Sequence, residues 1–343
     1  MFEININTSK SYSVYIESEP VESLRNKILC ENSKYLVVIS EKVEKLYGKM
    51  LNIPAENKFI LKDGENQKNF KNYQNILDKA FKLKLTRKDS FIAIGGGVVG
   101  DITGFAASTY MRGIKYIQVP TTLLACVDSS VGGKTAINTK YGKNLVGCFY
   151  QPDVVYINPT FLKTLDEKQY KSGLGEIIKY GFIEKNCLGN YNFLNFLSEK
   201  HISIIKRDEK TLSDLIQICV NLKKYVVERD ERESDLRRVL NFGHTWAHAV
   251  ELITNYKKYT HGEAVIDGIK YAFELALNKG LTDESYKFFA FDLIQKYGYK
   301  DLPKFNVNKM NNLMKLDKKA DSFCVRFVLP CEYATVKVCE ISV

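Results

Sequence analysis

The chain has 343 residues, of which 45% are hydrophobic and 26% charged. This composition is typical of an ordered globular protein and excludes an intrinsically disordered one, and the length is enough for two domains. The formal net charge of +10 comes from lysines and arginines spread along the chain rather than gathered in one arm or stripe. We therefore expect no nucleic-acid partner, and instead an anionic small-molecule substrate.

The N-terminus lacks the basic and then apolar pattern of a signal peptide, and no stretch approaches the roughly 18 apolar residues of a membrane span. The eight cysteines show no CxxC pair and no ligand-like spacing. This predicts free thiols rather than disulfides or a cysteine-based zinc site. We therefore expect a cytoplasmic protein with no membrane partner.

Short apolar runs in the first half of the chain predict buried strands, and helix-like stretches such as 42–50 and 69–85 lie between them. The strands are expected at residues 35–40, 58–61, 91–94, 116–119 and 154–157. Buried strands that alternate with helices predict an α/β domain with a Rossmann-like parallel sheet. Ligands of such sheets bind beyond the carboxyl ends of the strands.

From about residue 165 onward the pattern changes to long helical periodicity. Helices are expected at 167–184, 212–227, 244–252, 263–278 and 284–297, and one further strand at 323–329. The sequence therefore predicts a mainly α-helical second domain. No flexible linker separates the halves, so we expect two domains, 1–165 and 166–343, packed around a cleft.

A glycine-rich segment, GGGVVGD, directly follows the expected strand 91–94 and precedes an apolar helix-like stretch. Gly95, Gly97 and Gly100 satisfy the spacing GxGxxG, in which a dinucleotide pyrophosphate can approach the backbone and the helix N-terminus. The same glycines also suit an ordinary tight turn. No acidic residue stands about 20 positions further on to hold a ribose. A dinucleotide bound here would need its ribose held from elsewhere.

Three of the four histidines lie close together in the sequence: His244, His248 and His261. His244 and His248 would share one face of a helix, but HTWAH lacks the glutamate of the metalloprotease motif HExxH. A single histidine is usually an ordinary core or surface residue, whereas this grouping favours a metal site. Glu176, in GLGEIIKYG, is one of several acids that could complete a Zn²⁺ or Co²⁺ site.

Motifs along nearly the whole chain, taken in order, resemble the 3-dehydroquinate synthase family. They are GGGVVGD, YMRG, VPTTLLACVDSSVGGKTAIN, GKNLVGCFYQP, FLKTL, GEIIKYG, RDERESDLRRVLNFGHTWAHAVE and HGEAVIDG. The resemblance implies an N-terminal NAD-binding α/β domain, 1–165, and a helical metal- and substrate-binding domain, 166–343. Departures are small: Ala247 stands where many members have glycine, and Ile269 where methionine is common.

The resemblance also implies the cofactor and metal sites. Metal ligands would be Glu176, His244 and His261, and His248 would relay protons beside them. NAD would be held by Asp63, Gly64, Glu65, Asn66, Gln67, Lys68, Gly97, Val98, Val99, Gly100, Asp101, Thr121, Thr122, Lys134, Lys143, Phe161, Leu162, Lys163 and Thr164. The segment DGENQK would then supply the adenosine contacts that the glycine-rich turn lacks.

By the same resemblance the substrate is held by cationic and amide side chains. Lys223 and Arg237 would bind its carboxylate, Arg237 as a bidentate fork. The phosphate contacts would be Lys134, Asn144, Asn241 and one of Lys318 and Lys319, with Arg112 reaching in from the partner subunit of a homodimer. Asp128, Lys179 and Glu233 would contact or orient hydroxyl groups. Without the resemblance, the segment ERDERESDLRR would be predicted to be a solvated charged loop.

The activity implied is that of a carbon–oxygen lyase of aromatic amino acid biosynthesis, the second step of the shikimate pathway. It converts 3-deoxy-D-arabino-heptulosonate 7-phosphate to 3-dehydroquinate and phosphate. A substrate hydroxyl transiently gives hydride to NAD, phosphate is eliminated, hydride returns, and an intramolecular aldol reaction closes the ring.

Three other functions remain open at this point. A related sugar phosphate cyclase of the valiolone or inosose type would have different residues at the carboxylate-binding positions. The presence of Lys223 and Arg237 argues against this alternative. A metal-dependent polyol dehydrogenase would release net NADH, and Lys134, Lys143 and Asn144 favour a phosphorylated substrate instead. A non-catalytic NAD-binding regulator would not need Glu176, His244 and His261.

Overall fold

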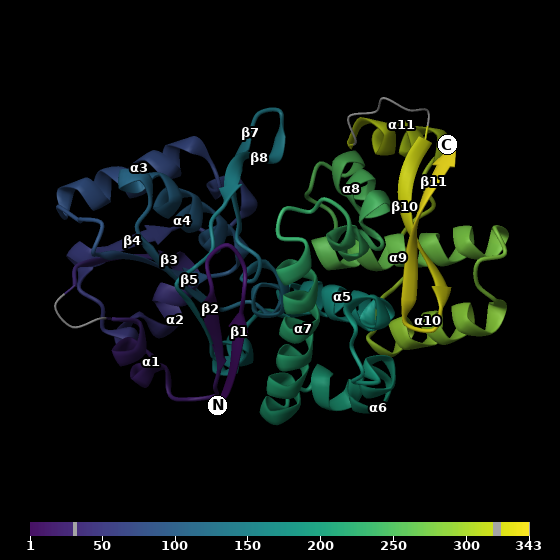
Figure 1. The fold of residues 1–343 in the computed structure, drawn as a ribbon, viewed down its shortest axis with the longest axis horizontal. Helices are drawn as coiled ribbons and strands as arrows, with labels where there is room; N and C mark the ends of the chain where they lie inside the picture. The colour runs from purple at the N-terminus through teal and green to yellow at the C-terminus, as the bar shows by residue number, and fades with distance from the viewer. Residues whose placement is uncertain (30–32, 318–323, 343) are drawn as a thin grey trace. The chain divides into compact units, whose positions relative to one another are not determined.

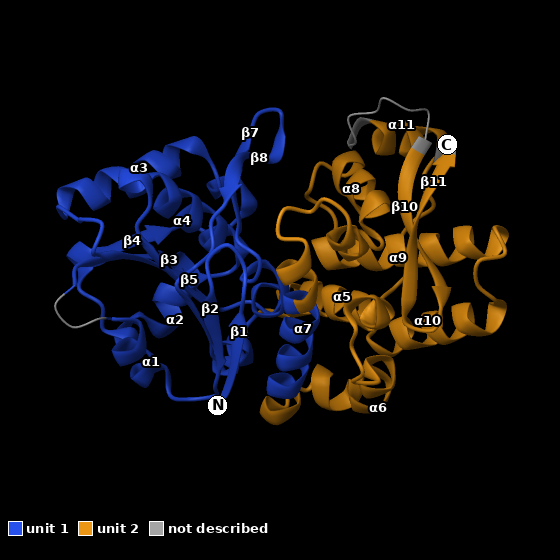
Figure 2. Ribbon diagram, in the orientation of Figure 1, with its two compact units in different colours: residues 1–165, 212–224 blue, residues 166–211, 225–343 orange. Residues whose placement is uncertain are grey.

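The computed structural model describes residues 1–29, 33–317 and 324–342, and it divides into two compact units (Figures 1 and 2). Unit 1 consists of Met1–Leu165 and Leu212–Lys224, and unit 2 of Asp166–Thr211 and Tyr225–Val343. The middle of helix α7 (Glu209–Arg229) therefore belongs to unit 1 and its two ends to unit 2. Among the described residues, no helix has the length and apolar character of a membrane span.

Unit 1 is built on a seven-stranded sheet in the order β1-β2-β9-β6-β5-β3-β4. The strands are β1 (Phe2–Ile6), β2 (Tyr12–Ile16), β3 (Tyr35–Ser40), β4 (Lys58–Leu61), β5 (Ser90–Gly95), β6 (Lys115–Pro120) and β9 (Val154–Ile157). All neighbours pair parallel except the β1–β2 hairpin, which the sequence analysis did not predict. The predicted parallel sheet is confirmed, and its five expected strands lie within it.

Both faces of this sheet are covered by helices, namely α1 (Val21–Ile28), α2 (Glu41–Leu51), α3 (Phe70–Lys82) and α4 (Gly97–Thr109). Leu36 and Val38 of β3 pack in one apolar cluster with α3 and α4, whereas Val37 and Ile39 pack in the other with α1 and α2. Successive side chains of a strand point to opposite faces. The central strands are therefore apolar at nearly every position, which is why they read as continuous apolar runs.

The order of the strands places a reversal of direction between β3 and β5, because the chain runs from β3 outward to β4 and then returns to the other side of β3. Ligands of open α/β sheets bind outside the carboxyl ends of the strands at such a point. The glycine-rich turn follows β5 directly, and the segment 63–68 follows β4. A separate two-stranded hairpin, β7 (Lys134–Thr139) with β8 (Gly142–Phe149), also belongs to unit 1.

Unit 2 is mainly helical, as predicted. Its elements include α5 (Glu167–Phe182), α6 (Phe193–Ile205), α8 (His244–Ile253), α9 (His261–Asn278), α10 (Glu284–Lys296), α11 (Val307–Asp317) and a hairpin of β10 (Cys324–Glu332) with β11 (Thr335–Ser342). Phe182 and Phe273 pack edge to face at 5.3 Å between ring centroids, and Phe242 and Tyr286 join them. These rings form the core from which α5 and α9 extend to the candidate metal ligands.

Candidate active site

A close approach of helices α5 and α9 brings two candidate metal ligands together. A side-chain carbon on Gly175 would lie 2.6 Å from the carbonyl oxygen of Gly262, and one on Gly262 would overlap the backbone of Ser172. No side chain separates the two helices here, so their backbones nearly touch. Glu176 follows the first glycine and His261 precedes the second. The crossing therefore fixes these two ligands relative to each other.

A second glycine contact places the third ligand. A side-chain carbon on Gly268 of α9 would overlap the backbone of Gly243, the N-cap residue of α8. Gly243 itself has a left-handed φ of 79°, which glycine adopts without strain. His244 is the next residue, so this contact holds its imidazole near α9. Each of the three ligands thus stands beside a glycine in the sequence, a signal that the sequence analysis did not use.

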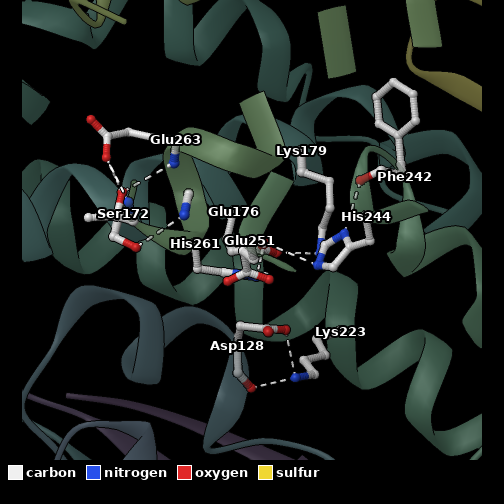
Figure 3. A network of polar contacts seen from close by, with 12 residues as sticks. Asp128, Ser172, Glu176, Lys179, Lys223, Phe242, His244, Glu251, His261 and Glu263 are labelled. Atoms are coloured by element: carbon white, nitrogen blue, oxygen red, sulfur yellow. Dashed lines mark hydrogen bonds and ion pairs between the residues drawn. The ribbon is translucent and has the colours of Figure 1, made fainter. Parts of the chain in front are cut away.

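The three ligands converge on one point (Figure 3). Glu176 Oε1 lies 3.4 Å from His244 Nε2 and 3.3 Å from His261 Nε2, and all three donor atoms lie within 4.8 Å of one another. The glutamate is fully buried, where a lone carboxylate is costly unless a cation or hydrogen bonds compensate its charge. Two imidazoles and one carboxylate form the ligand set of catalytic Zn²⁺ and Co²⁺ sites. The residues therefore fit a divalent cation.

Hydrogen bonds orient both imidazoles from behind. His244 Nδ1 lies 3.1 Å from the carbonyl oxygen of Phe242, and His261 Nδ1 lies 3.4 Å from Glu251 Oε1 (Figure 3). A histidine that donates through Nδ1 presents its Nε2 lone pair to a metal. Glu251 was missed in the sequence analysis, although its place two turns after His244 on α8 put it on the same helix face.

The two imidazoles differ in charge. Burial lowers the pKa of His261, but hydrogen bonds and charges from Glu176 and Glu251 outweigh burial and raise that pKa to about 10. Burial lowers the pKa of His244 to about 3, and the attraction of Glu176 does not compensate, because Lys179 and the other histidines repel a second positive charge. At neutral pH His261 therefore carries a proton that a bound cation would replace, whereas His244 is neutral.

Two further predicted residues lie beside the triad. Lys179 is buried one turn after Glu176 on α5, and its ammonium group donates to Glu176 Oε2. His248 lies one turn after His244 on α8, with 5.7 Å between the ring centroids. Both positions are close enough to the metal ligands for an effect on charge and proton transfer there.

A tight loop after α7 carries two other predicted residues, Glu233 and Arg237. The carboxylate of Asp230 accepts backbone N–H groups of Ser234 at 2.7 Å, Asp235 at 2.8 Å and Arg237 at 2.9 Å. Burial alone would raise the pKa of Asp230, but these hydrogen bonds outweigh burial and lower it to about 2. Asp230 therefore organises the loop as a carboxylate, and the sequence analysis missed it.

The side chains of this loop are not simply solvated, as the sequence without the family resemblance had suggested. Arg237 is only 2% exposed, and its guanidinium donates to the carbonyl oxygen of Glu231 at 2.5 Å. Asn241 Nδ2 donates to Glu233 Oε1 at 3.1 Å, which links the predicted phosphate contact to the loop. The loop is therefore solvated only in part, because Asp230 folds the backbone back and Arg237 is buried.

In unit 1, the predicted NAD-binding segment 63–68 is tied to the glycine-rich turn. Lys68 is 3% exposed, and its Nζ lies 2.8 Å from Asp101 Oδ2 and 3.4 Å from Glu65 Oε1. Burial lowers the pKa of Lys68, but the two carboxylates outweigh burial and raise it, so the ammonium stays charged. Gly64 has a left-handed φ of 112°, which makes the turn into η2 (Glu65–Gln67). Asp63, Asn66 and Gln67 are the other members of this segment.

The glycine-rich turn lies where β5 and β6 end side by side. Thr121 donates its backbone N–H to the carbonyl oxygen of Gly95 at 3.0 Å. A side-chain carbon on Gly96, the N-cap residue of α4, would lie 2.9 Å from Thr122 Cγ2. The first turn of α4, residues 97–101, therefore starts beside the predicted pair Thr121 and Thr122. Free N–H groups at a helix start suit a phosphate.

The last predicted NAD contacts, residues 161–164, follow β9 in η5 (Pro159–Thr164). Phe161 and Leu162 are buried in the core, so only backbone groups of these two residues are available to a ligand. Lys163 is exposed, and Thr164 Oγ1 lies 2.7 Å from the hydroxyl of Tyr47.

The remaining predicted substrate residues of unit 1 lie in three places. Lys223 of α7 donates to Asp128 Oδ1 at 2.6 Å and to the carbonyl oxygen of Asp128 at 2.5 Å (Figure 3). Lys134, Lys143 and Asn144 all belong to the β7–β8 hairpin. Arg112 is exposed with a left-handed φ of 65°. The predicted pair Lys318 and Lys319 lies outside the described residues.

Comparison with known proteins covers nearly the whole chain. The sequence profile of the 3-dehydroquinate synthase N-terminal domain matches residues 58–172, and that of the C-terminal domain matches residues 173–320. The 3-dehydroquinate synthase of Alkaliphilus metalliredigens (strain QYMF) is 43% identical over 332 residues, which cover 95% of this chain and 91% of that relative.

Solved structures share the fold. A 2-deoxy-scyllo-inosose synthase complexed with carbaglucose-6-phosphate, NAD⁺ and Co²⁺ has a TM-score of 0.86 and 26% identity, and the match covers 99% of this chain and 97% of that chain. The 2-epi-5-epi-valiolone synthase of Streptomyces hygroscopicus subsp. jinggangensis 5008, with NAD⁺ and Zn²⁺ bound, has a TM-score of 0.85 and 24% identity, with 100% and 96% covered.

Proposed function

Because the chain belongs to the 3-dehydroquinate synthase family, we propose that it converts 3-deoxy-D-arabino-heptulosonate 7-phosphate to 3-dehydroquinate and phosphate. The observation that carries this proposal is the 43% identity across 95% of the chain to a protein of that name. The solved cyclases of the inosose and valiolone type are less similar, at 26% and 24% identity. The triad of the buried Glu176 with the partly exposed His244 and His261 supports a metal-dependent reaction.

The cofactors of the proposed reaction are NAD and a divalent cation, Zn²⁺ or Co²⁺. When bound, NAD takes up and returns a hydride, and the cation polarises a substrate hydroxyl. Glu176, His244 and His261 would hold the cation. The carboxyl-end segments of unit 1, above all 63–68 and 97–101, would hold NAD. The ion pair between Lys68 and Asp101 supports this assignment, because it keeps the two segments in one arrangement.

Proton transfer is assigned to the side chains next to the triad. Lys179 neutralises part of the Glu176 charge and keeps an ammonium group beside the metal ligands. His248 is assigned the role of receiving or returning a proton, which its position one turn from His244 supports. Because the substrate is a phosphate ester with its own basic oxygens, the main contribution expected of the protein is orientation and charge stabilisation.

Substrate anions are assigned to cationic and amide groups in each unit. In unit 1, Lys134 and Asn144 of the β7–β8 hairpin are assigned to the phosphate group. In unit 2, Arg237 offers a guanidinium fork to a carboxylate, and Asn241 joins the phosphate contacts. Lys223 is assigned to the substrate carboxylate and Asp128 to a hydroxyl group, and the ion pair between them at 2.6 Å supports a shared position for the two side chains.

The proposal includes a division of labour in which residues 1–165 bind NAD and residues 166–343 bind the metal, while both parts contribute substrate contacts. It also includes a homodimer in which Arg112 reaches the substrate of the partner subunit, supported by the exposure of Arg112 next to Met111, which is 41% exposed. A cytoplasmic location is supported by six free cysteines among the described residues.

A phosphate-release assay tests the activity. The purified protein is loaded with Zn²⁺ or Co²⁺ and given the heptulosonate phosphate with NAD far below the substrate concentration. Many phosphates released per NAD, without accumulation of NADH, are expected because the hydride returns. Stoichiometric NADH would indicate a polyol dehydrogenase instead. Turnover of a hexose or heptose phosphate without the carboxylate, and none of the heptulosonate phosphate, would indicate a related cyclase.

A further inference from the structure

Asn138 connects two loops of unit 1 that the proposed function assigns to different ligands. Its side-chain nitrogen donates to Glu65 Oε1 at 2.8 Å and to the carbonyl oxygen of Glu65 at 3.2 Å. Its Oδ1 accepts the backbone N–H of Asn144 at 3.0 Å. Its own backbone N–H donates to the carbonyl oxygen of Lys68 at 2.8 Å. One residue therefore holds both ends of the turn 65–68 against the β7–β8 hairpin.

The backbone around Asn138 departs from a regular hairpin. The pairing of β7 with β8 passes from Ile137 opposite Val146 to Thr139 opposite Gly142, so that Asn138 has no register partner. Residues 143–145 of β8 all stand opposite Asn138, so the bulge is on β8 and interrupts the ladder at this point. The backbone N–H of Asn138 donates to Lys68, and its side chain donates to Glu65. Asn138 thus lies between the bulge of β8 and the turn 65–68.

The backbone of Asn144 is also held by Asn138. It has a left-handed φ of 57°, a conformation that asparagine tolerates better than most residues and that a local hydrogen bond can hold. The hydrogen bond from its N–H to Asn138 Oδ1 is such a restraint. Loss of this bond would let the Asn144 backbone relax and move its side chain.

On the side of the cofactor, the network extends to the glycine-rich turn. Glu65 and Asp101 both face the ammonium group of Lys68, at 3.4 Å and 2.8 Å. Asn138 contacts Glu65 and the Lys68 backbone, so any ligand that orders this turn also orders the hairpin. Asn138 was not among the residues that the sequence singled out.

We propose that Asn138 is a positioning residue that couples the NAD-binding segment 65–68 to the phosphate contact Asn144, so that bound NAD and a bound phosphate group each strengthen the binding of the other. This inference rests on the proposed function for the identity of the two ligands. Coupling between two sites is reciprocal, so the factor by which NAD tightens phosphate binding equals the factor by which phosphate tightens NAD binding.

Calorimetry with the full chain tests the coupling. The dissociation constant of NAD is measured without and with saturating inorganic phosphate, and that of phosphate without and with NAD. The unchanged protein is expected to show a coupling factor of at least about 5. Asn138→Ala is expected to bring this factor close to 1, because it removes both side-chain links. A factor near 1 in the unchanged protein, or an unaltered factor in Asn138→Ala, would overturn the inference.

A second pair of variants, in which residues 138 and 65 exchange the roles of hydrogen-bond donor and acceptor, distinguishes a positioning role of Asn138 from a general loss of structure. Asn138→Asp keeps the acceptor for Asn144 but sets a carboxylate against Glu65, so NAD affinity is expected to fall much more than phosphate affinity. Combining Asn138→Asp with Glu65→Gln restores a hydrogen bond with the roles exchanged, and coupling is expected to return in part. Equal coupling in Asn138→Asp and in the double variant would contradict the proposed link.

Asn57→Ala is the matched control. Asn57 Nδ2 donates to the carbonyl oxygen of Tyr35 at 2.9 Å, so this variant also removes an amide hydrogen bond in unit 1 but leaves both loops intact. Its coupling factor is expected to equal that of the unchanged protein. If coupling depends on Asn138 but the protein does not act on the heptulosonate phosphate, only the proposed function is contradicted. If the protein is active but Asn138→Ala leaves the coupling factor unchanged, only this inference is contradicted.

Discussion

The imidazole of His261 lies between the carboxylates of Glu176 and Glu251, at 3.3 Å and 3.4 Å, and its pKa is raised to about 10. A cation must therefore displace a proton before it binds Nε2. Because the raised pKa lies above neutral pH, the proton is fully present at pH 7 and is lost only as the pH rises through about 10. Metal affinity should accordingly increase with pH.

For the metal-binding equilibrium we expect the affinity for Zn²⁺ to rise about tenfold per pH unit between about pH 7 and pH 9. Glu251→Gln should flatten this slope, since removal of one carboxylate lowers the pKa of His261. Titration calorimetry in buffers of different ionisation enthalpy measures the proton released. The control is Glu274→Gln, an exposed glutamate on α9, the helix that carries His261. A slope that is equally steep in Glu251→Gln would contradict the role given to Glu251.

At the scale of elements, the metal site depends on helices that touch through glycines. Gly262→Ala would force α9 away from the backbone of Ser172, and the separation would move His261 away from Glu176. We expect Zn²⁺ affinity to fall at least about a hundredfold, since catalytic zinc ligands lie only about 2.0–2.2 Å from the ion. Metal titration together with a melting curve measures the effect.

Gly280→Ala serves as the control for this prediction. Gly280 has a left-handed φ of 64° but nothing within 4 Å of an added side-chain carbon. Gly280→Ala should lower the free energy of unfolding by about 1 kcal/mol through backbone strain alone and leave metal affinity unchanged. If both alanine variants bind Zn²⁺ as well as the unchanged protein, the glycine contact does not determine the site.

The loop after α7 gives a prediction about acid stability. The pKa of Asp230 is lowered to about 2, so the carboxylate stabilises the folded state above the unfolded pKa of 3.8, and this stabilisation is lost as the pH falls through about 2. Asp230→Asn should therefore reduce the free energy of unfolding by about 2 kcal/mol at pH 7, and the difference from the unchanged protein should shrink below about pH 4.

Urea unfolding at several pH values measures that difference, and Asp235→Asn is the control from the same loop. Its side chain is exposed and makes no capping hydrogen bond to η7 (Leu236–Asn241), so little change is expected. A penalty for Asp230→Asn that stays constant from pH 7 to pH 2 would show that the charge of Asp230 is not what organises the loop.

At the scale of the whole molecule, the two units should respond separately to substitution. His261→Ala should abolish Zn²⁺ binding and turnover while NAD affinity changes by less than about threefold, because all three ligands belong to unit 2. Lys68→Met should lower NAD affinity and leave Zn²⁺ affinity unchanged, since Lys68 forms ion pairs with Glu65 and Asp101 of unit 1. Calorimetry with each ligand measures both. Equal loss of both affinities in either variant would contradict the division of labour.

Local patterns in the sequence were enough for much of the fold. The strand runs such as 35–40 and the helices such as α5 and α10 were predicted because apolar periodicity depends on neighbours two to four residues away. The hairpin β1–β2 and helix α6 were not predicted. The residues that complete the metal triad, Glu176, His244 and His261, were singled out by the histidine grouping and the family resemblance together.

By itself the sequence determined the alternation of the central strands with helices, the change to a helical second half and the chemical types of the ligand side chains, because these follow from which residues are near one another along the chain. Only the tertiary structure decided that Gly175 meets Gly262, that Glu251 supports His261, and that Asn138 links two loops. Such contacts join residues far apart in sequence or in separate elements. They depend on how closely two backbones approach, which no local pattern encodes.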